Sequence, residues 1–503
     1  MRKFNSFLAV LMLAITLSLS AGSTTFGAPI RSNHLMQALT SIEQPTENSR
    51  VYLPVIVGQR TVRRVNAPYF DVVDVMDSHF TEMSIYWFGR VTQTENYADV
   101  RIAYNNTELY VYLAVFDRRL WYDPSHVTAN LTAWDSVSLN LALGGNSGSI
   151  PASSTYRFDA QLNDWEDPRT NWQAAYRGNG SGWTAAGLPF TTYDANRWDS
   201  PTEGGLNNNE NNRGWAMTYV IPFSSLGLSG PPSQGSVWGM AIALHDRDDQ
   251  SGTPIGDKLW PETMSANSPS TWGQLAFGLP AYTPPATSSQ GTVTIRHRLN
   301  GATVDDGGVG GYTICGGGMD YWTDWGERVY YAFLENNTYV EYGDFNIQNQ
   351  SDIADWPCFS KYYVTFPLGA VPSGKTIVSA KLAMYQFGNS DPVHATASLI
   401  QVLTVGDAWS ETALNWNNAP LALENVSRAW VDPLPGFAGF PGVRREWDVS
   451  RAVAQAYTSG SPLRLVLYSA DDDYNSGMYF VSSDTGDWNA TGRPTLQVVW
   501  GNP

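Results

Sequence analysis

The stretch that decides the fold is Asp99-Val-Arg-Ile-Ala-Tyr-Asn-Asn-Thr-Glu-Leu-Tyr-Val-Tyr-Leu-Ala-Val-Phe-Asp117. Its two halves are rich in β-branched and aromatic residues, and Asn105-Asn106 between them suits the tight turn of a β-hairpin. Similar runs, separated by turn residues, continue to about residue 280; they are 136–143, 215–221 and 237–244. The pattern predicts that residues 60–280 form a β domain.

A second β region follows a segment rich in Pro, Ser and Thr. Residues 281–291 have the composition of an interdomain linker. Residues 292–503 again alternate β-rich runs with turns, and the only segment with a clear helical pattern is 449–457. We therefore expect an all-β protein with two tandem β-sandwich, jelly-roll-like domains, 60–280 and 292–503.

The N-terminus predicts export from the cytoplasm. Arg2 and Lys3 precede the apolar run Phe7–Leu19, and small residues follow up to Gly27. This order is typical of a signal peptide, here residues 1–28, and the run is shorter than the roughly 20 residues that span a bilayer. Residues 29–59 are expected to be a flexible segment with a short strand. No later apolar stretch is long enough to span a membrane, so we expect a secreted or cell-surface protein.

The charge balance narrows the possible partners. The net charge is −17 and the chain has no block rich in Lys and Arg, so nucleic acid is not an expected partner. An acidic polysaccharide is disfavoured unless arginines cluster or a cation bridges. The sequence carries no signal for an oligomeric state.

Cys315 and Cys358 are the only cysteines. In an oxidising compartment two lone cysteines more often pair than stay free, so a disulfide between them is expected. Two separate buried thiols are the alternative.

The first domain resembles the family 9 carbohydrate-binding modules. The resemblance is carried by the paired strands of 99–117, by Trp134-Asp-Ser-Val, by Ile221-Pro-Phe-Ser-Ser-Leu-Gly and by the strand and acidic loop of 237–249. It implies that a sugar is clamped between two tryptophans. By position these are Trp134 and Trp260, with Asp135 and Arg247 as polar partners. The alternative for Trp134 is a core aromatic residue.

The second domain resembles the DNRLRE-type domains of secreted polysaccharide-degrading proteins. The most specific segment is Trp409-Ser-Glu-Thr-Ala-Leu-Asn-Trp-Asn-Asn-Ala-Pro420, followed by Trp447-Asp-Val-Ser. Trp409 and Trp416 are expected to be structural. Trp322 and Trp325 lie in an insertion relative to the family and are candidates for stacking on a sugar ring.

A calcium site is the one cofactor that the sequence suggests. Asp246, Asp248 and Asp249 follow a predicted strand, and calcium takes six to eight oxygen ligands. The resemblance to the family 9 modules implies a cation-bearing fold. Solvated turn acids are the alternative interpretation.

Three functions remain open. The first is a secreted, non-catalytic protein that binds extracellular polysaccharide through aromatic platforms. The second is a glycoside hydrolase or polysaccharide lyase with its site in the Trp-rich segment 144–213, although no nucleophile elbow or His-Glu-x-x-His motif occurs. The third is a structural or adhesive surface protein.

Overall fold

The structure is a computed structural model in which residues Gln59–Pro503 form one compact unit. It describes residues 62–72, 79–125, 127–164, 169–195, 205–251, 254–310, 320, 322–329, 332–335, 338–341, 344–349, 359–471 and 475–503. The predicted signal peptide and the strand predicted at 50–57 lie outside the described residues. Among the described residues, the helices are too short or too polar to cross a membrane.

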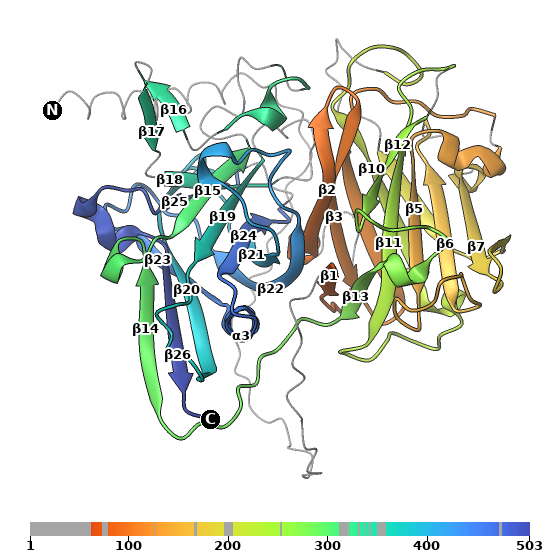
Figure 1. The fold of residues 1–503 in the computed structure, drawn as a ribbon. Coiled ribbons are helices and arrows are strands. Elements are labelled where there is room, and N and C mark those ends of the chain that lie inside the picture. The colour runs from red at the N-terminus through yellow and green to blue at the C-terminus, as the bar shows by residue number, and fades with distance from the viewer. Residues whose placement is uncertain are drawn as a thin grey trace. The chain divides into compact units, whose positions relative to one another are not determined.

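Two facing sheets build the first β-sandwich (Figure 1). The five-stranded sheet has the order β2-β3-β4-β10-β9. Its strands are β2 (Ser84–Thr92), β3 (Glu95–Tyr104), β4 (Glu108–Phe116), β10 (Gly214–Pro222) and β9 (Thr191–Ala195). The facing strands are β13 (Gly273–Phe277), β11 (Val237–Asp246), β5 (Ser136–Ala142), β6 (Thr155–Gln161), β7 (Gln173–Gly178) and β8 (Trp183–Ala185), with β12 (Ile255–Trp260) paired to β11.

The hairpin predicted around Asn105-Asn106 is confirmed. β3 and β4 pair antiparallel from Tyr97↔Phe116 to Tyr104↔Leu109. The side-chain oxygen of Asn105 accepts the backbone N–H groups of Thr107 and Glu108, each at 2.8 Å, which closes the turn. Because successive side chains of a strand point to opposite faces, one set of β4 residues packs between the two sheets. That set comprises Leu109, Val111, Leu113 and Val115, all fully buried.

The Trp-rich segment 144–213 is part of the same sandwich. Its described residues form β6, β7 and β8 at one end of the larger sheet and β9 at one end of the smaller sheet. Trp172, in the short 3-10 helix Arg169–Trp172, is 1% exposed and donates its indole N–H to the carbonyl of Asp123. The described part of the segment therefore extends the sandwich and contributes to its core.

The second β-sandwich follows residues 281–289, which have no regular secondary structure. One sheet has the order β14-β26-β20-β25-β18, with β23 paired to β20. Its strands are β14 (Gln290–Arg296), β26 (Thr495–Gly501), β20 (Thr376–Asn389), β25 (Met478–Val481), β18 (Asp344–Ile347) and β23 (Val443–Asp448). Facing it are β15 (Asp305–Gly310), β19 (Ser360–Phe366), β24 (Leu463–Ser469), β21 (Ser398–Val405) and β22 (Ala422–Val431). A separate pair is formed by β16 (Ala332–Glu335) and β17 (Thr338–Glu341).

The predicted helix is found at α3 (Ser450–Thr458), one residue from the expected 449–457. It packs on β20 and β24, and Ala452 and Val453 enter the core of the second sandwich. The all-β fold with two sandwiches is thus confirmed. The shift of one residue is within the usual uncertainty of helix ends.

One strand joins the two sandwiches into a continuous sheet. β1 (Arg64–Ala67) runs parallel to β13 of the first sandwich, with Val65 opposite Leu275. Its other edge meets β22 of the second sandwich at Arg64↔Glu424. The larger sheet therefore contains 13 strands drawn from both sandwiches.

A shared apolar cluster lies between the sandwiches. It contains aromatic residues from the five-stranded sheet, including Trp87 and Tyr97, and aromatic residues of the second sandwich, including Tyr363, Trp416 and Tyr468. Both faces of the five-stranded sheet are therefore covered. A strand that is buried on both faces has a nearly continuous run of apolar residues in its sequence. β4 (Glu108–Phe116) has such a run.

Candidate functional site

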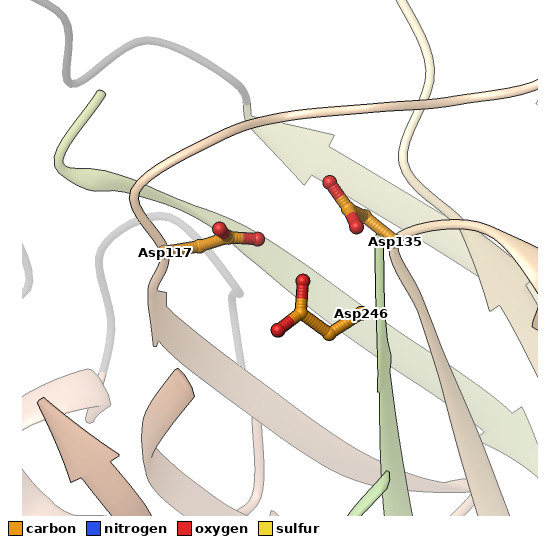
Figure 2. A group of neighbouring side chains, drawn as sticks. All are labelled: Asp117, Asp135 and Asp246. Atoms are coloured by element: carbon orange, nitrogen blue, oxygen red, sulfur yellow. The ribbon is translucent and has the colours of Figure 1, made fainter. Parts of the chain in front are cut away.

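Three aspartates converge at one end of the first sandwich (Figure 2). Asp117 directly follows β4, Asp135 directly precedes β5, and Asp246 ends β11. β5 and β11 are antiparallel neighbours with Ser136 opposite His245, so the start of one strand meets the end of the other. One oxygen from each aspartate lies within 4.8 Å of the other two.

The hydrogen bonds of the three carboxylates differ sharply. Asp117 accepts the backbone N–H of Arg119 at 3.0 Å and the indole N–H of Trp215 at 3.1 Å. Asp135 accepts the backbone N–H groups of Trp121 at 2.6 Å and Arg247 at 2.9 Å. Neither carboxylate oxygen of Asp246, which is 2% exposed, accepts a well-aligned hydrogen bond from the described residues, although the side-chain amide of Asn96 lies close enough to lower its pKa.

The electrostatics of the cluster follow from this burial. Desolvation raises the pKa of Asp117 and of Asp135 well above its usual value, and the neighbouring carboxylates add to both shifts. Desolvation and the charge of Asp248 raise the pKa of Asp246 to about 7, while Lys258 opposes the rise. Three buried carboxylates cannot all be ionised at low cost without a compensating positive charge.

The donor set fits a hard divalent cation. It consists of carboxylate oxygens, the ligand type that calcium prefers, and the oxygens of Asp246 are free to coordinate. A bound cation would also lower the pKa values that burial raises. The three aspartates could hold calcium, with further oxygens needed to complete its shell of six to eight.

This cluster differs from the predicted calcium ligands in two of three members. Asp246 is shared, but its partners are Asp117 and Asp135 rather than Asp248 and Asp249. Asp248 is partly buried and acts on Asp246 through its charge. Asp249 is exposed and accepts the backbone N–H of Ser251, as a turn acid does. The sequence offered a signal for Asp117, because this residue directly follows the second strand of the predicted hairpin 99–117.

Asp135 and Arg247 have structural contacts in addition to any role in binding. Both oxygens of Asp135 hold backbone N–H groups, and the residue is fully buried, so it presents no oxygen to a polysaccharide. The guanidinium of Arg247 lies over the ring of Trp134, 4.3 Å from its centroid. Trp134 is half-buried, and this face of its indole is already covered by the arginine.

Trp260 does not form the predicted clamp. It is 2% exposed, belongs to the core of the first sandwich, and packs against Tyr86 with ring centroids 4.7 Å apart. Gly273 makes room for this ring, since a Cβ there would lie 2.9 Å from the indole. The predicted role of Trp260 in sugar binding is wrong in this structure, because no face of its ring reaches solvent.

The predicted platform of Trp322 and Trp325 is wrong for the same reason. Trp322 is 6% exposed and Trp325 is fully buried. Trp325 packs on Trp416 with ring centroids 4.7 Å apart, within the cluster between the two sandwiches. Cys315 and Cys358, the predicted disulfide, lie outside the described residues.

A chain of polar side chains that the sequence reasoning missed crosses the outer face of the larger sheet. Arg157 donates twice to Asp159, at 2.7 Å each, and Ser138 donates to Asp159 at 2.6 Å. Nε2 of His245 lies 3.0 Å from Ser138 Oγ, and its Nδ1 lies 2.9 Å from Asp257. In the sequence, this polar face is indicated by polar residues that alternate with core residues along β5, β6 and β11.

Aromatic rings border this polar chain. Tyr176 is opposite Arg157 in the ladder, and the guanidinium lies 5.4 Å from its ring centroid. Trp183 on β8 stacks parallel to Trp272, with centroids 6.5 Å apart and an interplanar angle of 3°. Tyr176 and Trp183 are partly exposed. Polar groups that can read hydroxyls thus lie on the same sheet as partly exposed rings.

Ser138, His245 and Asp257 have the order of a nucleophilic triad, but the serine is not presented as a nucleophile. Ser138 lies in the middle of β5, is 3% exposed, and donates its hydroxyl proton to Asp159. A catalytic serine instead donates to its histidine and faces a substrate. The arrangement is that of a largely buried hydrogen-bonded network on one face of the sheet.

A second acidic group lies in the second sandwich and consists of Asp306, Glu411 and Asp484. Asp306 is satisfied by protein donors: it accepts the hydroxyl of Tyr362 and both the backbone N–H and the hydroxyl of Ser483 at 2.7 Å. Its carboxylate therefore does not need a cation.

Comparison with protein families places one segment of the chain. Residues 334–498 match the model of carbohydrate-binding module family 96. The matched segment covers most of the second sandwich. A comparison with curated protein sequences found no match. One segment of the chain is thus similar to a carbohydrate-binding module.

Solved structures similar to part of the chain include carbohydrate-binding proteins. A family 9 carbohydrate-binding module from Caldicellulosiruptor kristjanssonii in complex with cellotriose is 17% identical, with a TM-score of 0.31, covering 43% of this chain and 94% of that chain. The same kind of module from that organism in complex with glucose is 19% identical, with a TM-score of 0.30, covering 44% and 100%. A putative carbohydrate-binding protein from Bacteroides uniformis is 13% identical, with a TM-score of 0.29, covering 43% and 100%. Likeness this low assigns no ligand.

Proposed function

We propose that this protein is a secreted, non-catalytic polysaccharide-binding protein. The observation that carries the proposal is the match of residues 334–498 to a family of carbohydrate-binding modules. The composition supports it, because aromatic residues make up 13% of the chain and a sugar ring stacks on aromatic faces. The signal-peptide pattern of residues 1–28 would place the protein where polysaccharide is found.

In the first sandwich, the outer face of the larger sheet is the surface that we assign to binding. Arg157 and Asp257 keep part of their polar atoms accessible, and the buried Asp159 and His245 hold them in fixed positions. Asp257 is the most accessible of these polar side chains, and the ring of Tyr176 beside Arg157 is partly exposed. Rigid polar groups beside an aromatic ring favour recognition of a sugar at low entropic cost.

The binding of polysaccharide can be measured by affinity gel electrophoresis of the mature chain. We expect retardation in gels that contain at least one of β-glucan, xylan, glucomannan or polygalacturonate. Tyr176→Ala is expected to weaken the retardation. Tyr193→Ala, which removes a 45% exposed tyrosine on β9 of the other sheet, is the matched control.

Two outcomes would contradict the proposal. If the wild type migrates freely in every gel, the protein does not bind these polysaccharides. If it releases reducing sugar or unsaturated products from a polysaccharide that retards it, the protein is a hydrolase or a lyase. A structural or adhesive role remains the alternative for a chain that neither binds nor cleaves.

We also propose that calcium occupies the cluster of Asp117, Asp135 and Asp246. What supports this is the buried Asp246, whose two oxygens accept no well-aligned hydrogen bond, together with the carboxylates of Asp117 and Asp135 beside it. The ion would tie β4 of one sheet to β5 and β11 of the other. It would thus stabilise the end of the sandwich from which Arg247 and Trp134 project.

Calcium is tested by thermal unfolding after treatment with EDTA. Adding calcium at about 100 times its dissociation constant should stabilise the wild type by about 2.7 kcal/mol. Asp246→Asn should lose this response and, in EDTA, should unfold at a higher temperature than the wild type, because the amide carries no uncompensated charge. Asp249→Asn is the control and should respond as the wild type does. A wild type without any calcium response would refute the site.

A further inference from the structure

Exposed aromatic rings gather at one place on the second sandwich. Among the described residues, the phenylalanines and tryptophans with a large exposed fraction are Trp430, Phe437, Phe440 and Trp488. Phe440 contacts two of the others, with its ring centroid 5.3 Å from that of Phe437 and 4.7 Å from that of Trp488. Their exposed fractions are 60% for Phe437, 47% for Phe440 and 71% for Trp488.

The loop that carries the two phenylalanines is tied down to β20. The backbone N–H of Leu434 donates to the side chain of the buried Asn389 at 2.6 Å. Phe387 of β20 packs against both Phe437 and Phe440. Gly442 has φ of +99°, and a Cβ there would lie 2.6 Å from the carbonyl oxygen of Gln386. The loop can approach the strand this closely only with glycine at this position.

Trp488 is held in place although most of its surface is exposed. Its indole lies against the backbone of Gly486, where a Cβ would come within 2.7 Å of the ring. The neighbouring Asp487 binds the buried Arg493 at 2.6 Å and the exposed Arg298 at 3.2 Å. Arg493 and Arg298 keep the pKa of Asp487 below its usual range. The ring is therefore presented on a fixed turn.

We infer that Phe437, Phe440 and Trp488 form a second binding platform, on which the apolar C–H faces of a pyranose polysaccharide stack. We name these three residues the aromatic platform. The inference rests on the proposed function, and it names a surface for it in the second sandwich. Rings that are fixed before binding lose little conformational entropy when a ligand binds. Most of the favourable stacking energy therefore contributes to the free energy of binding.

The surroundings of the aromatic platform favour a glycan over a protein partner. The other exposed apolar residues of this region are Pro435, the small Ala438 and Val443, which is 37% exposed, so the rings do not continue into a broad apolar surface. A stable protein interface buries about 800 Å² on each partner around an apolar centre. The rim here is polar, with Arg298 and Asp487 beside Trp488.

The charge of the rim is also compatible with a sugar chain. Asp487 is flanked by two arginines, Arg298 and Arg493. Glu446 on the nearby strand β23 is likewise flanked by Lys381 and Arg444. In a chain of net charge −17, this surface therefore carries the exposed cations Arg298, Lys381 and Arg444 beside these two carboxylates, while Arg493 is buried beneath Asp487. Its donors can bind hydroxyl oxygens, and carboxylate oxygens where a sugar has them.

The test compares the full mature chain with Phe440→Ala/Trp488→Ala and with Trp430→Ala in gels containing β-glucan, xylan, glucomannan or polygalacturonate. Trp430→Ala is the matched control, because it removes a 47% exposed tryptophan from β22. We expect the double variant to lose about tenfold in affinity for a polysaccharide that retards the wild type, a loss of about 1.4 kcal/mol. The control should bind as the wild type does, and Trp488→Phe should restore part of the loss. Because these side chains lie at the surface, with Trp488 71% and Phe440 and Trp430 each 47% exposed, all variants should fold, and the melting temperature of each is measured to separate lost binding from lost stability.

Three outcomes would overturn the inference, and they are distinguishable. Equal retardation of the double variant and the wild type in every responsive gel removes the aromatic platform but leaves the proposed function standing. Free migration of the wild type in every gel removes both. Sedimentation of the wild type as a dimer that the double variant does not form, with equal retardation, makes these rings a protein interface.

Discussion

Lys361 has an environment very different from that of a surface lysine. It lies on β19, is 1% exposed, and its ammonium group faces four aromatic rings. The ring centroids lie between 3.6 and 4.9 Å away and belong to Trp87, Tyr97, Trp416 and Tyr468. The ammonium also donates to the hydroxyl of Tyr97. Trp87 and Tyr97 come from the first sandwich, so this one side chain contacts both sandwiches.

Burial lowers the pKa of Lys361 well below its usual value, and the charge of Asp99 opposes the change. The unfolded chain therefore binds more protons than the folded chain between the lowered pKa and about 10.4. Within that window the free energy of unfolding rises with pH, by at most about 1.4 kcal/mol per pH unit from this group. The rise comes from Lys361 alone only where its tyrosine neighbours do not titrate. Burial raises the pKa values of Tyr97, Tyr363 and Tyr468. These tyrosines therefore lower the free energy of unfolding only at about pH 10 and above, where tyrosine in the unfolded chain loses its proton.

Lys361→Met should remove this dependence. The measurement is urea unfolding of wild type and variant at several pH values from 7.5 to 9.5. We expect a steeper rise of stability with pH for the wild type than for the variant, because methionine binds no proton. Lys381→Met, which replaces a 58% exposed lysine, should leave the slope unchanged. Equal slopes for wild type and Lys361→Met would contradict the expectation.

At the scale of elements, β1 depends on the side chain of Asn425, which forms hydrogen bonds with the backbone of β1 in place of a neighbouring strand. The side-chain oxygen of Asn425 accepts the backbone N–H of Asn66 at 2.7 Å, and its amide donates to the carbonyl of Asn66 at 3.0 Å. The same amide donates to Ser84 at 2.9 Å. The amide of Asn425 thus completes the hydrogen bonding of β1 where the backbone of β22 does not reach it.

Asn425→Leu should therefore destabilise the protein by about 2–4 kcal/mol, since it leaves buried backbone and hydroxyl groups without partners. The change in the free energy of unfolding is measured by urea denaturation. Ser427→Ala on the same strand is the control, and it should stay within about 0.5 kcal/mol of the wild type. A loss below that value for Asn425→Leu would show that β1 does not need this side chain.

The sequence placed the N-terminal edge strand at 50–57, outside the described residues, and did not single out 64–67. The reason is that β1 has only four residues, Arg64-Val-Asn-Ala67, without a clear alternation. Its role depends on β13 and β22, which lie about 200 and 350 residues further along the chain.

At the scale of the whole molecule, the two sandwiches share a sheet and a core. The 13-stranded sheet passes from one to the other through β1, and the aromatic cluster around Trp87, Trp416 and Tyr468 lies between them. Buried polar contacts add to these: Arg101 donates to the carbonyls of Ala470 and Asp471. Tandem domains joined by a linker usually move relative to one another unless their interface is large and apolar.

Cutting the chain between the sandwiches should therefore not separate them. A site for a specific protease in place of residues 283–288 would allow cleavage in a segment without regular secondary structure. After cleavage the two fragments should elute together from a gel-filtration column in native buffer and separately in urea. Separate elution in native buffer would mean that the interface does not hold the sandwiches together by itself.

Much of the fold could be predicted from local pattern. The hairpin at Asn105, the strands on either side of it and the helix near Val453 follow from residue types within a few positions. The site was predicted only in part: Asp246 was identified, but Asp117 was not, because it belongs to the opposite sheet. The two sheets meet through packing between residues distant in sequence, which no local pattern reports.

The strand-rich stretch from Asp99 to Asp117 by itself determined an all-β fold, because alternation and turn chemistry act over a few residues. Tertiary structure alone decided which aromatic rings face solvent. Trp260, Trp322 and Trp325 stand in loop-like sequence but are covered by other parts of the chain, whereas Trp488 keeps 71% of its surface exposed. An aromatic ring is buried by the side chains that pack on it, and these side chains come from residues far away in the sequence.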